Sequence, residues 1–179
     1  LKQNWWYDGR RDLVQSTDVA LNYLQHLYDQ FDDWVLAFAA YNCGEGTVSR
    51  AQARNRAQGK GTDYWSIRPL LPRETRGYVP RLLAIAAAAR NPAQFDVSLP
   101  PIANEPYFSI VKLNSQVDLG LAAKIMGVDL KTLQKLNPGF KRWATDPDGP
   151  HRLLVPAQLA KRLRTGLGKI PPSQRVTWR

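Results

Sequence analysis

Residues 39–48 read Ala-Ala-Tyr-Asn-Cys-Gly-Glu-Gly-Thr-Val, and they lie where a strongly apolar segment gives way to a polar one. The apolar segment, residues 34–41, predicts a helix that is buried nearly all round. Gly44 and Gly46 are expected to break this helix, because glycine adopts the backbone conformations with which helices commonly end. A polar helix is expected to follow from residue 45. The stretch therefore predicts a helix boundary at which backbone can approach another molecule closely.

The side chains at this boundary suit a sugar. The phenol of Tyr41 offers a flat stacking face, and the amide of Asn42 both donates and accepts hydrogen bonds. A structural interpretation stays open for both residues. Tyr41 could be a core aromatic at the end of a buried helix, and Asn42 could only cap that helix.

Length and composition are typical of a globular protein with one or two small domains. The chain has 179 residues, of which 44% are hydrophobic and 22% charged. Because no 18 consecutive residues are apolar, we expect no transmembrane helix in this chain. It begins at Leu1 without an apolar signal sequence, so we interpret it as an excised or processed piece. Two histidines and the single cysteine, Cys43, show no metal-ligand spacing, so we expect neither a metal nor another cofactor.

The charge balance is strongly basic. Lys and Arg exceed Asp and Glu by 25 − 15 = 10, which favours an anionic partner such as a nucleic acid, a membrane surface or an acidic polymer. A basic solvated surface without a partner is an equally good interpretation. The basic residues are scattered singly and do not form the basic and aromatic stripe of a nucleic-acid surface. We therefore expect no nucleic-acid partner.

The first part of the chain predicts a bundle of helices. Ser16 and Thr17 are N-cap candidates for a helix that ends near Phe31, and Asp18 suits its first turn. Asp32 and Asp33 can cap the next helix. A further helix is expected over residues 73–90, with a kink or a fresh start at Pro80.

The second part predicts a smaller unit with strands. A proline-rich linker, residues 97–106, precedes an alternating strand at residues 107–113. Two short helices follow, and Arg-Leu-Leu-Val-Pro at residues 152–156 predicts a second strand. The remaining residues, 158–179, predict a basic tail with little helix. The fold class is therefore mainly α, with a β-α-α-β unit after a helical domain.

Several spaced motifs resemble the lytic murein transglycosylases, most of all the membrane-bound D type. They are Asn-Trp-Trp-Tyr-Asp at residues 4–8, the stretch at residues 39–48, and Pro-Arg-Glu-Thr-Arg-Gly-Tyr-Val-Pro at residues 72–80. Residues 1–96 resemble the C-terminal part of the lysozyme-like domain of that family. Residues 107–157 resemble a degenerate LysM module, in which Ser-Gln-Val-Asp-Leu at residues 115–119 replaces the usual opening.

The resemblance implies cleavage of peptidoglycan between N-acetylmuramic acid and N-acetylglucosamine, with formation of a 1,6-anhydro end. One glutamate with a raised pKa acts first as acid and then as base in this chemistry. It implies that Tyr41, Asn42 and Gly44 line the saccharide groove and that Glu74 and Tyr78 lie at its far side. The family's catalytic glutamate would lie upstream of Leu1, because its Glu-Ser motif does not occur here. We therefore expect these residues alone to be inactive.

Other interpretations remain open. The chain could be a noncatalytic peptidoglycan-binding module, or, less in keeping with its charge pattern, a basic nucleic-acid-binding protein. The partners that we expect are glycan strands of peptidoglycan, with self-association through exposed apolar surface. The resemblance implies a periplasmic location, with outer-membrane attachment through a segment outside this chain.

Two further features have competing interpretations. Arg142, Trp143 and the loop at residues 146–150 could form the ligand edge of the LysM-like unit or only a well-capped surface loop. A nucleophilic role for Cys43 would need a base partner, and nothing in the sequence places His26 or His151 near it. We therefore do not expect Cys43 to be catalytic.

Overall fold

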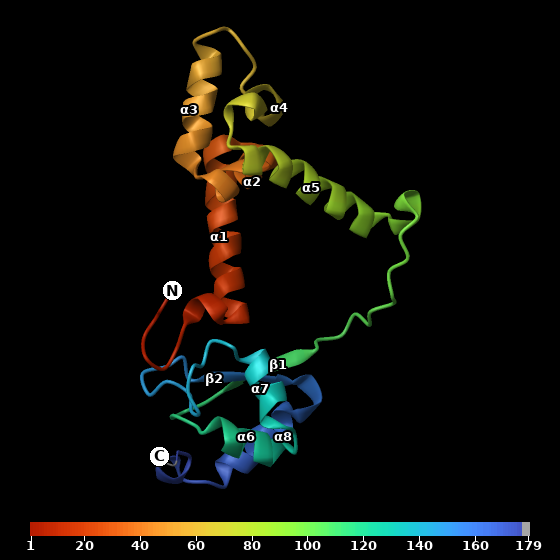
Figure 1. The fold of residues 1–179 in the computed structure, drawn as a ribbon. Coiled ribbons are helices and arrows are strands. Elements are labelled where there is room, and N and C mark those ends of the chain that lie inside the picture. The colour runs from red at the N-terminus through yellow and green to blue at the C-terminus, as the bar shows by residue number, and fades with distance from the viewer. Residues whose placement is uncertain (177–179) are drawn as a thin grey trace. The chain divides into compact units, whose positions relative to one another are not determined.

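The computed structural model describes residues 1–176, and it confirms the mainly helical fold class. The chain divides into two compact units (Figure 1). Unit 1 combines Leu1–Asp18 with the residues from Ala103 onward, and unit 2 comprises Val19–Ile102. The family-like segments predicted from the sequence are contiguous stretches of chain, whereas unit 1 is built from both ends. The predicted segment boundaries stay a prediction.

Unit 2 is a set of helices around one apolar core. It contains most of α1 (Leu13–Phe31), α2 (Trp34–Cys43), α3 (Glu45–Arg56), α4 (Tyr64–Ile67) and α5 (Arg73–Arg90). As predicted, Asp33 caps α2, where its side chain accepts hydrogen bonds from the amides of Val35 and Leu36. The buried side chains come from every helix of the unit and include Leu27, Leu36, Ala40, Val48, Tyr64, Ile67 and Val79.

Helix α5 runs through Pro80 without a fresh start. Proline has no amide hydrogen, so Pro80 cannot donate to the carbonyl of Arg76 one turn earlier. A side chain from outside the helix, Arg68, donates to that carbonyl instead through its Nε at 3.0 Å. The acceptor that Pro80 leaves free is therefore satisfied, which lets the helix continue.

Unit 1 contains the predicted β-α-α-β order. Strand β1 (Phe108–Lys112) pairs antiparallel with β2 (Arg152–Pro156), and Ile110 lies opposite Leu154. Helices α6 (Leu119–Met126) and α7 (Leu130–Leu136) lie between the strands in sequence. Asp118 caps α6, as capping rules favour for an aspartate before an apolar helix, and Gly127 ends it with a φ of +75°.

The C-terminal residues add a packed helix to this unit. Helix α8 (Ala160–Gly168) buries Leu163 and Leu167 in the same core as the strands. Beyond it, the guanidinium of Arg175 donates to the carbonyl of Leu167 at 2.8 Å and to the side chain of Asn114. The prediction of a tail with little helix at residues 158–179 thus missed a core element. The last three of those residues lie outside the described part of the chain.

The N-terminal segment packs against the turn that follows α7. The amide of Asp8 donates to the carbonyl of Gly139, and the amide of Lys141 donates to the carbonyl of Trp6, both at 2.8 Å. Tyr7 is fully buried, and its ring lies 5.2 Å from that of Phe140. The N-terminal segment is therefore held on unit 1 by backbone hydrogen bonds, and its Tyr7 belongs to the core of that unit.

Asp12 connects this segment to β2 and to α1. Its carboxylate accepts hydrogen bonds from the Tyr7 hydroxyl at 2.8 Å and from Arg152 Nη2 at 2.6 Å. It also accepts from the amides of Val14 and Gln15, so it caps α1. Burial, together with the Asp12 carboxylate, raises the pKa of Tyr7 and keeps the phenol protonated. The sequence-based N-caps were wrong, since the helix begins before Ser16.

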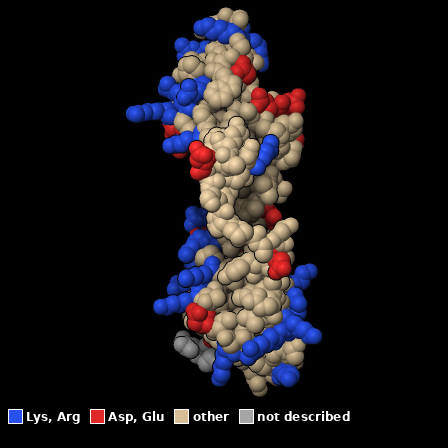
Figure 2. All heavy atoms as spheres, turned by 90° about the vertical axis from the view of Figure 1, so that its right-hand side faces the viewer, with Lys and Arg blue, Asp and Glu red and all other residues tan. Residues whose placement is uncertain are grey.

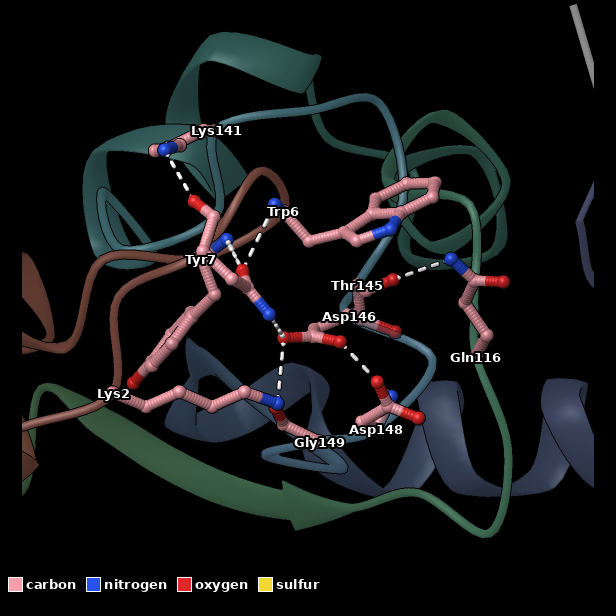
Figure 3. Close-up of polar contacts among 10 residues, drawn as sticks. Lys2, Trp6, Tyr7, Gln116, Lys141, Thr145, Asp146, Asp148 and Gly149 are labelled. Atoms are coloured by element: carbon pink, nitrogen blue, oxygen red, sulfur yellow. Dashed lines mark hydrogen bonds and ion pairs between the residues drawn. The ribbon is translucent and has the colours of Figure 1, made fainter.

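Asp146 makes a second connection to the N-terminal segment (Figure 3). Its fully buried carboxylate lies 2.9 Å from Lys2 Nζ and accepts a hydrogen bond of 2.7 Å from the Asn4 side chain. The amide of Asp148 donates to its other oxygen at 2.9 Å. Burial raises the pKa of Asp146, but the hydrogen bonds from Lys2, Asn4 and Asp148 outweigh it, and the net shift is downward.

None of the helices in residues 1–176 has the length and apolar composition of a membrane span.

On the face that Figure 2 shows, Lys and Arg side chains stand in several separate groups on each unit.

Replacing Asp12 should destabilise unit 1 more than replacing a nearby exposed aspartate. In Asp12→Ala, Arg152 and Tyr7 lose a buried acceptor and α1 loses its cap, so we expect a loss of about 2–4 kcal/mol in unfolding free energy. Asp18→Ala, which removes an exposed carboxylate of the same helix, should change it by less than about 0.5 kcal/mol. Urea unfolding followed through NMR signals of unit 1 measures both, and equal effects would contradict the role of Asp12.

Acid should weaken unit 1 through Asp146. Because its pKa is lowered on folding, its stabilising contribution is complete at neutral pH. That contribution is lost as the pH falls from about 4 through the folded pKa. Asp146→Asn should lower the unfolding free energy near pH 7 by about 1–2 kcal/mol. It should also reduce the drop in stability between about pH 6 and pH 3, and an unchanged drop would contradict the role of Asp146.

Candidate functional site

The predicted helix boundary is made by one glycine. Helix α2 ends at Cys43, and α3 begins at Glu45. Gly44 between them has a φ of +86°, and its amide donates to the carbonyl of Ala40 at 2.7 Å. No atom lies within 4 Å of the position of a β-carbon there, so the backbone conformation alone demands glycine. Gly46 lies inside the first turn of α3, and the expectation that it also breaks the helix was wrong.

Tyr41 lies at the surface of unit 2. It is 40% exposed, and its ring centroid lies 5.9 Å from that of Tyr23 on α1. Tyr23 in turn stacks on His26 with nearly parallel rings. The exposure argues against a purely core role for Tyr41 and leaves part of an aromatic surface open to solvent.

Asn42 joins α2 to the first turn of α5. Its Oδ1 accepts a hydrogen bond of 2.7 Å from the Thr75 hydroxyl, and its Nδ2 donates to Glu74 Oε1 at 3.3 Å. Both partners are more than thirty residues away in the sequence. The interpretation of Asn42 as only a helix cap was wrong, because Gly44 is the C-cap of α2 and the Asn42 side chain bonds to α5 instead.

The other predicted site residues follow on α5. Glu74 is exposed, whereas Tyr78, one turn later, is partly buried and packs against the core of unit 2. Residues four apart share a helix face, so the two side chains project from the same side of α5. The structure brings Glu74 directly to Asn42. The assignment of a saccharide groove to the five predicted residues stays a prediction; they are Tyr41, Asn42, Gly44, Glu74 and Tyr78.

Two supporting residues were not singled out from the sequence. Thr75 is buried and holds the Asn42 amide, and Tyr64 donates from α4 to the carbonyl of Thr75 at 3.2 Å. Thr75 lies within the Glu-Thr-Arg motif, so its position next to Glu74 could have marked it as a site residue from the sequence. The hydroxyl of Tyr64 could only be placed once α4 and α5 were seen to pack.

Cys43 is poorly suited to nucleophilic chemistry. Burial is the largest influence on its thiol and raises its pKa, whereas a reactive cysteine needs a lowered one. Among residues 1–176, no group of three His, Cys, Asp or Glu side chains could hold a metal ion.

The loop of the LysM-like unit packs against the N-terminal segment, and whether it is also a ligand edge stays a prediction. Asp146 within it is buried against Lys2 and Asn4, as described above. The Arg142 guanidinium lies 3.8 Å from the centre of the Trp5 ring, and the Trp143 ring lies 5.3 Å from that of Trp6. Trp6 is partly buried and packs against the core of unit 1, whereas Trp5 is 52% exposed.

Comparison with known proteins identifies both parts of the chain. Residues 1–63 match the family model of the transglycosylase SLT domain, and residues 107–171 match that of the lytic transglycosylase MltD, LysM-like domain. The membrane-bound lytic murein transglycosylase D of Escherichia coli (strain K12) is 41% identical over 168 residues, which is 93% of this chain and 37% of the relative.

A second relative shares a shorter stretch. The putative tributyltin chloride resistance protein of Alteromonas sp. (strain M-1) is 55% identical over 47 residues, which is 26% of this chain and 23% of that protein. The chain thus spans well under half the length of the curated relatives that it matches.

The two glycines at the helix boundary should respond differently to substitution. Gly44→Ala forces an L-residue to a positive φ, so we expect it to destabilise unit 2 by about 1–2 kcal/mol. Gly46→Ala lies in a helix where a β-carbon would meet only the flexible end of Arg50, so it should be neutral or stabilise by up to about 1 kcal/mol. Thermal unfolding of unit 2 measures both, and a neutral Gly44→Ala would contradict the assigned backbone conformation.

Proposed function

The chain belongs to the lytic murein transglycosylases of the membrane-bound D type, and on this premise we propose that it serves the non-hydrolytic cleavage of peptidoglycan. The bond cleaved joins N-acetylmuramic acid to N-acetylglucosamine, and the muramic acid 6-hydroxyl closes on its own C1 to leave a 1,6-anhydro end. The observation that carries the proposal is the polar bridge from Asn42 to Glu74 and Thr75, which lies beside an exposed Tyr41.

The bridge offers the chemistry that a glycan needs. An exposed phenol ring stacks on a sugar face, and fixed amide and carboxylate groups bond to its hydroxyl and acetamido groups. Because Thr75 and Asn42 hold each other in place, little side-chain entropy is lost when the sugar binds. Tyr41, Asn42, Gly44, Glu74 and Tyr78 are the residues that we assign to this groove.

We further propose that these 179 residues bind glycan without cleaving it. The glutamates in the sequence are Glu45, Glu74 and Glu105, and none lies in the Glu-Ser motif of the family's acid. Glu74 is exposed to solvent, whereas a general acid of this kind lies in an apolar pocket. The alternative function, a noncatalytic glycan-binding module, would use the same residues to bind glycan. It differs from the proposal only in that the protein would take no part in cleavage.

Location and self-association belong to the proposal as well. The E. coli relative is described as membrane-bound, which supports a periplasmic location with attachment to the outer membrane. Exposed apolar side chains lie on α1 and α5 of unit 2, among them Leu21 at 59% and Ile85 at 68%. They support self-association, which sedimentation velocity over a range of concentrations would detect.

Binding to peptidoglycan should depend on Tyr41. We expect the chain to co-sediment with insoluble peptidoglycan and to release no soluble 1,6-anhydro product. Tyr41→Ala should weaken binding about 3- to 10-fold through loss of the stacking face. Trp65→Ala is the matched control, because it removes another exposed aromatic side chain from the same unit and should leave binding unchanged.

The results separate the parts of the proposal. Anhydro products from the wild-type chain would show that one of its carboxylates acts as the acid, and Glu74→Gln and Glu45→Gln would identify which. Absence of binding would contradict the assigned groove.

A further inference from the structure

Unit 1 carries a basic pocket that neither family resemblance nor the groove explains. It has a volume of about 680 Å³, and it is lined by Arg11 from the turn Gly9–Arg11 and by side chains of α7 and the turn after it. Lys131, Lys135 and Lys141 add three more cations, and Phe140 contributes an apolar surface. No acidic side chain lines the pocket.

The charges of the pocket are not neutralised within the described chain. Within residues 1–176, the side chains of Arg11, Lys131 and Lys135 are exposed and form neither a hydrogen bond nor an ion pair. Lys141 Nζ donates to the carbonyl of Asn4, which carries no charge. Asp8 lies near Lys141, but Arg10 holds its carboxylate at 2.8 Å. The pocket therefore keeps a strongly positive potential.

The frame of the pocket is rigid. The amide of Asp8 donates to the carbonyl of Gly139, and Tyr7 packs against Phe140. A β-carbon on Gly139 would lie only 2.8 Å from the Tyr7 ring, so the two segments are in close contact. A site formed before its ligand arrives loses less entropy on binding.

The arrangement of these groups indicates the ligand chemistry. The pocket lining contains separate, flexible cations around a wide opening, and it lacks the glycine-rich loop of backbone amides that typically cradles one compact phosphate. Separate point charges on flexible stems can each reach a different carboxylate along a chain. Phe140 and Pro138 suit the alkyl carbons between those carboxylates.

We propose that this pocket binds the carboxylates of the peptides attached to peptidoglycan. The inference rests on the proposed function, because that function supplies a polymer whose peptides carry free carboxylates. The groove of unit 2 would then hold the sugars, while the pocket of unit 1 would select strands that still carry their peptides.

The test compares three probes: intact insoluble peptidoglycan, glycan strands from which an amidase has removed the peptides, and the free acidic peptide. The double variant Lys131→Gln/Lys135→Gln should bind intact peptidoglycan and free peptide about 3- to 10-fold more weakly than the wild-type chain. Its binding to peptide-free strands should not change. The wild-type affinity for the free peptide should also fall as salt rises.

Two controls keep the comparison specific. Lys161→Gln/Lys169→Gln removes two positive charges from another pocket of unit 1, on α8, and should leave all three affinities unchanged. Lys131→Arg/Lys135→Arg keeps the charges and should restore binding. All these lysines are exposed, so the variants should fold like the wild-type chain.

Failure of the inference and failure of the proposed function give different results. The inference is overturned if the pocket variant binds the free peptide as the wild-type chain does, or if the α8 control loses as much affinity. It is also overturned if DNA or anionic phospholipid vesicles bind the pocket more tightly than the peptide, since the site would then serve another polyanion. If only the peptide-free strands fail to bind the wild-type chain, the proposed groove is wrong while the pocket stands.

Discussion

The carboxylate of Asp12 is the group on which unit 1 depends. It accepts hydrogen bonds from Tyr7, from Arg152 on β2 and from the first amides of α1, and it is only 8% exposed. An acceptor of this kind is costly to remove, because its donors would be left buried without partners. Through it, a segment at the start of the chain is tied to a sheet made near its end. Arg11, which lines the basic pocket, is its direct neighbour in sequence.

Unit 2 is also held by a polar contact between distant residues, but this contact lies at the surface. Asn42 holds the first turn of α5 by a neutral hydrogen bond to Thr75, and the same side chain reaches the exposed Glu74. The contact therefore stabilises the packing of α2 on α5 and presents polar groups to solvent at once. In unit 1 the corresponding polar groups, Asp12 and Asp146, are buried, and each holds the N-terminal segment to a later part of the unit.

Local signals in the sequence predicted much of this fold. Asp33, Asp118 and Gly127 act where capping rules place them. The first strand of the small sheet was found from alternation, and the second from its apolar run at residues 152–156. The missed features depend on contacts between distant residues. Asp12 was overlooked as a cap because Ser16 and Thr17 lie closer to the apolar pattern of the helix. Helix α8 was overlooked because its two core leucines stand between basic residues that read as a polar tail. The uninterrupted α5 depends on Arg68, which no local rule links to Pro80. At the candidate site, the sequence singled out Asn42 and Glu74 but not the hydrogen bond between them.

The central claim is that residues 1–18 fold as part of unit 1, and amide hydrogen exchange tests it most directly. The amides of Asp8 and Lys141 donate to Gly139 and Trp6 across the junction between the two ends of the chain. The account predicts that both exchange as slowly as the amides of β1 and β2, because one cooperative opening exposes them all. Exchange at the rate of an unstructured peptide for Asp8 and Lys141, with β1 and β2 still protected, would contradict it.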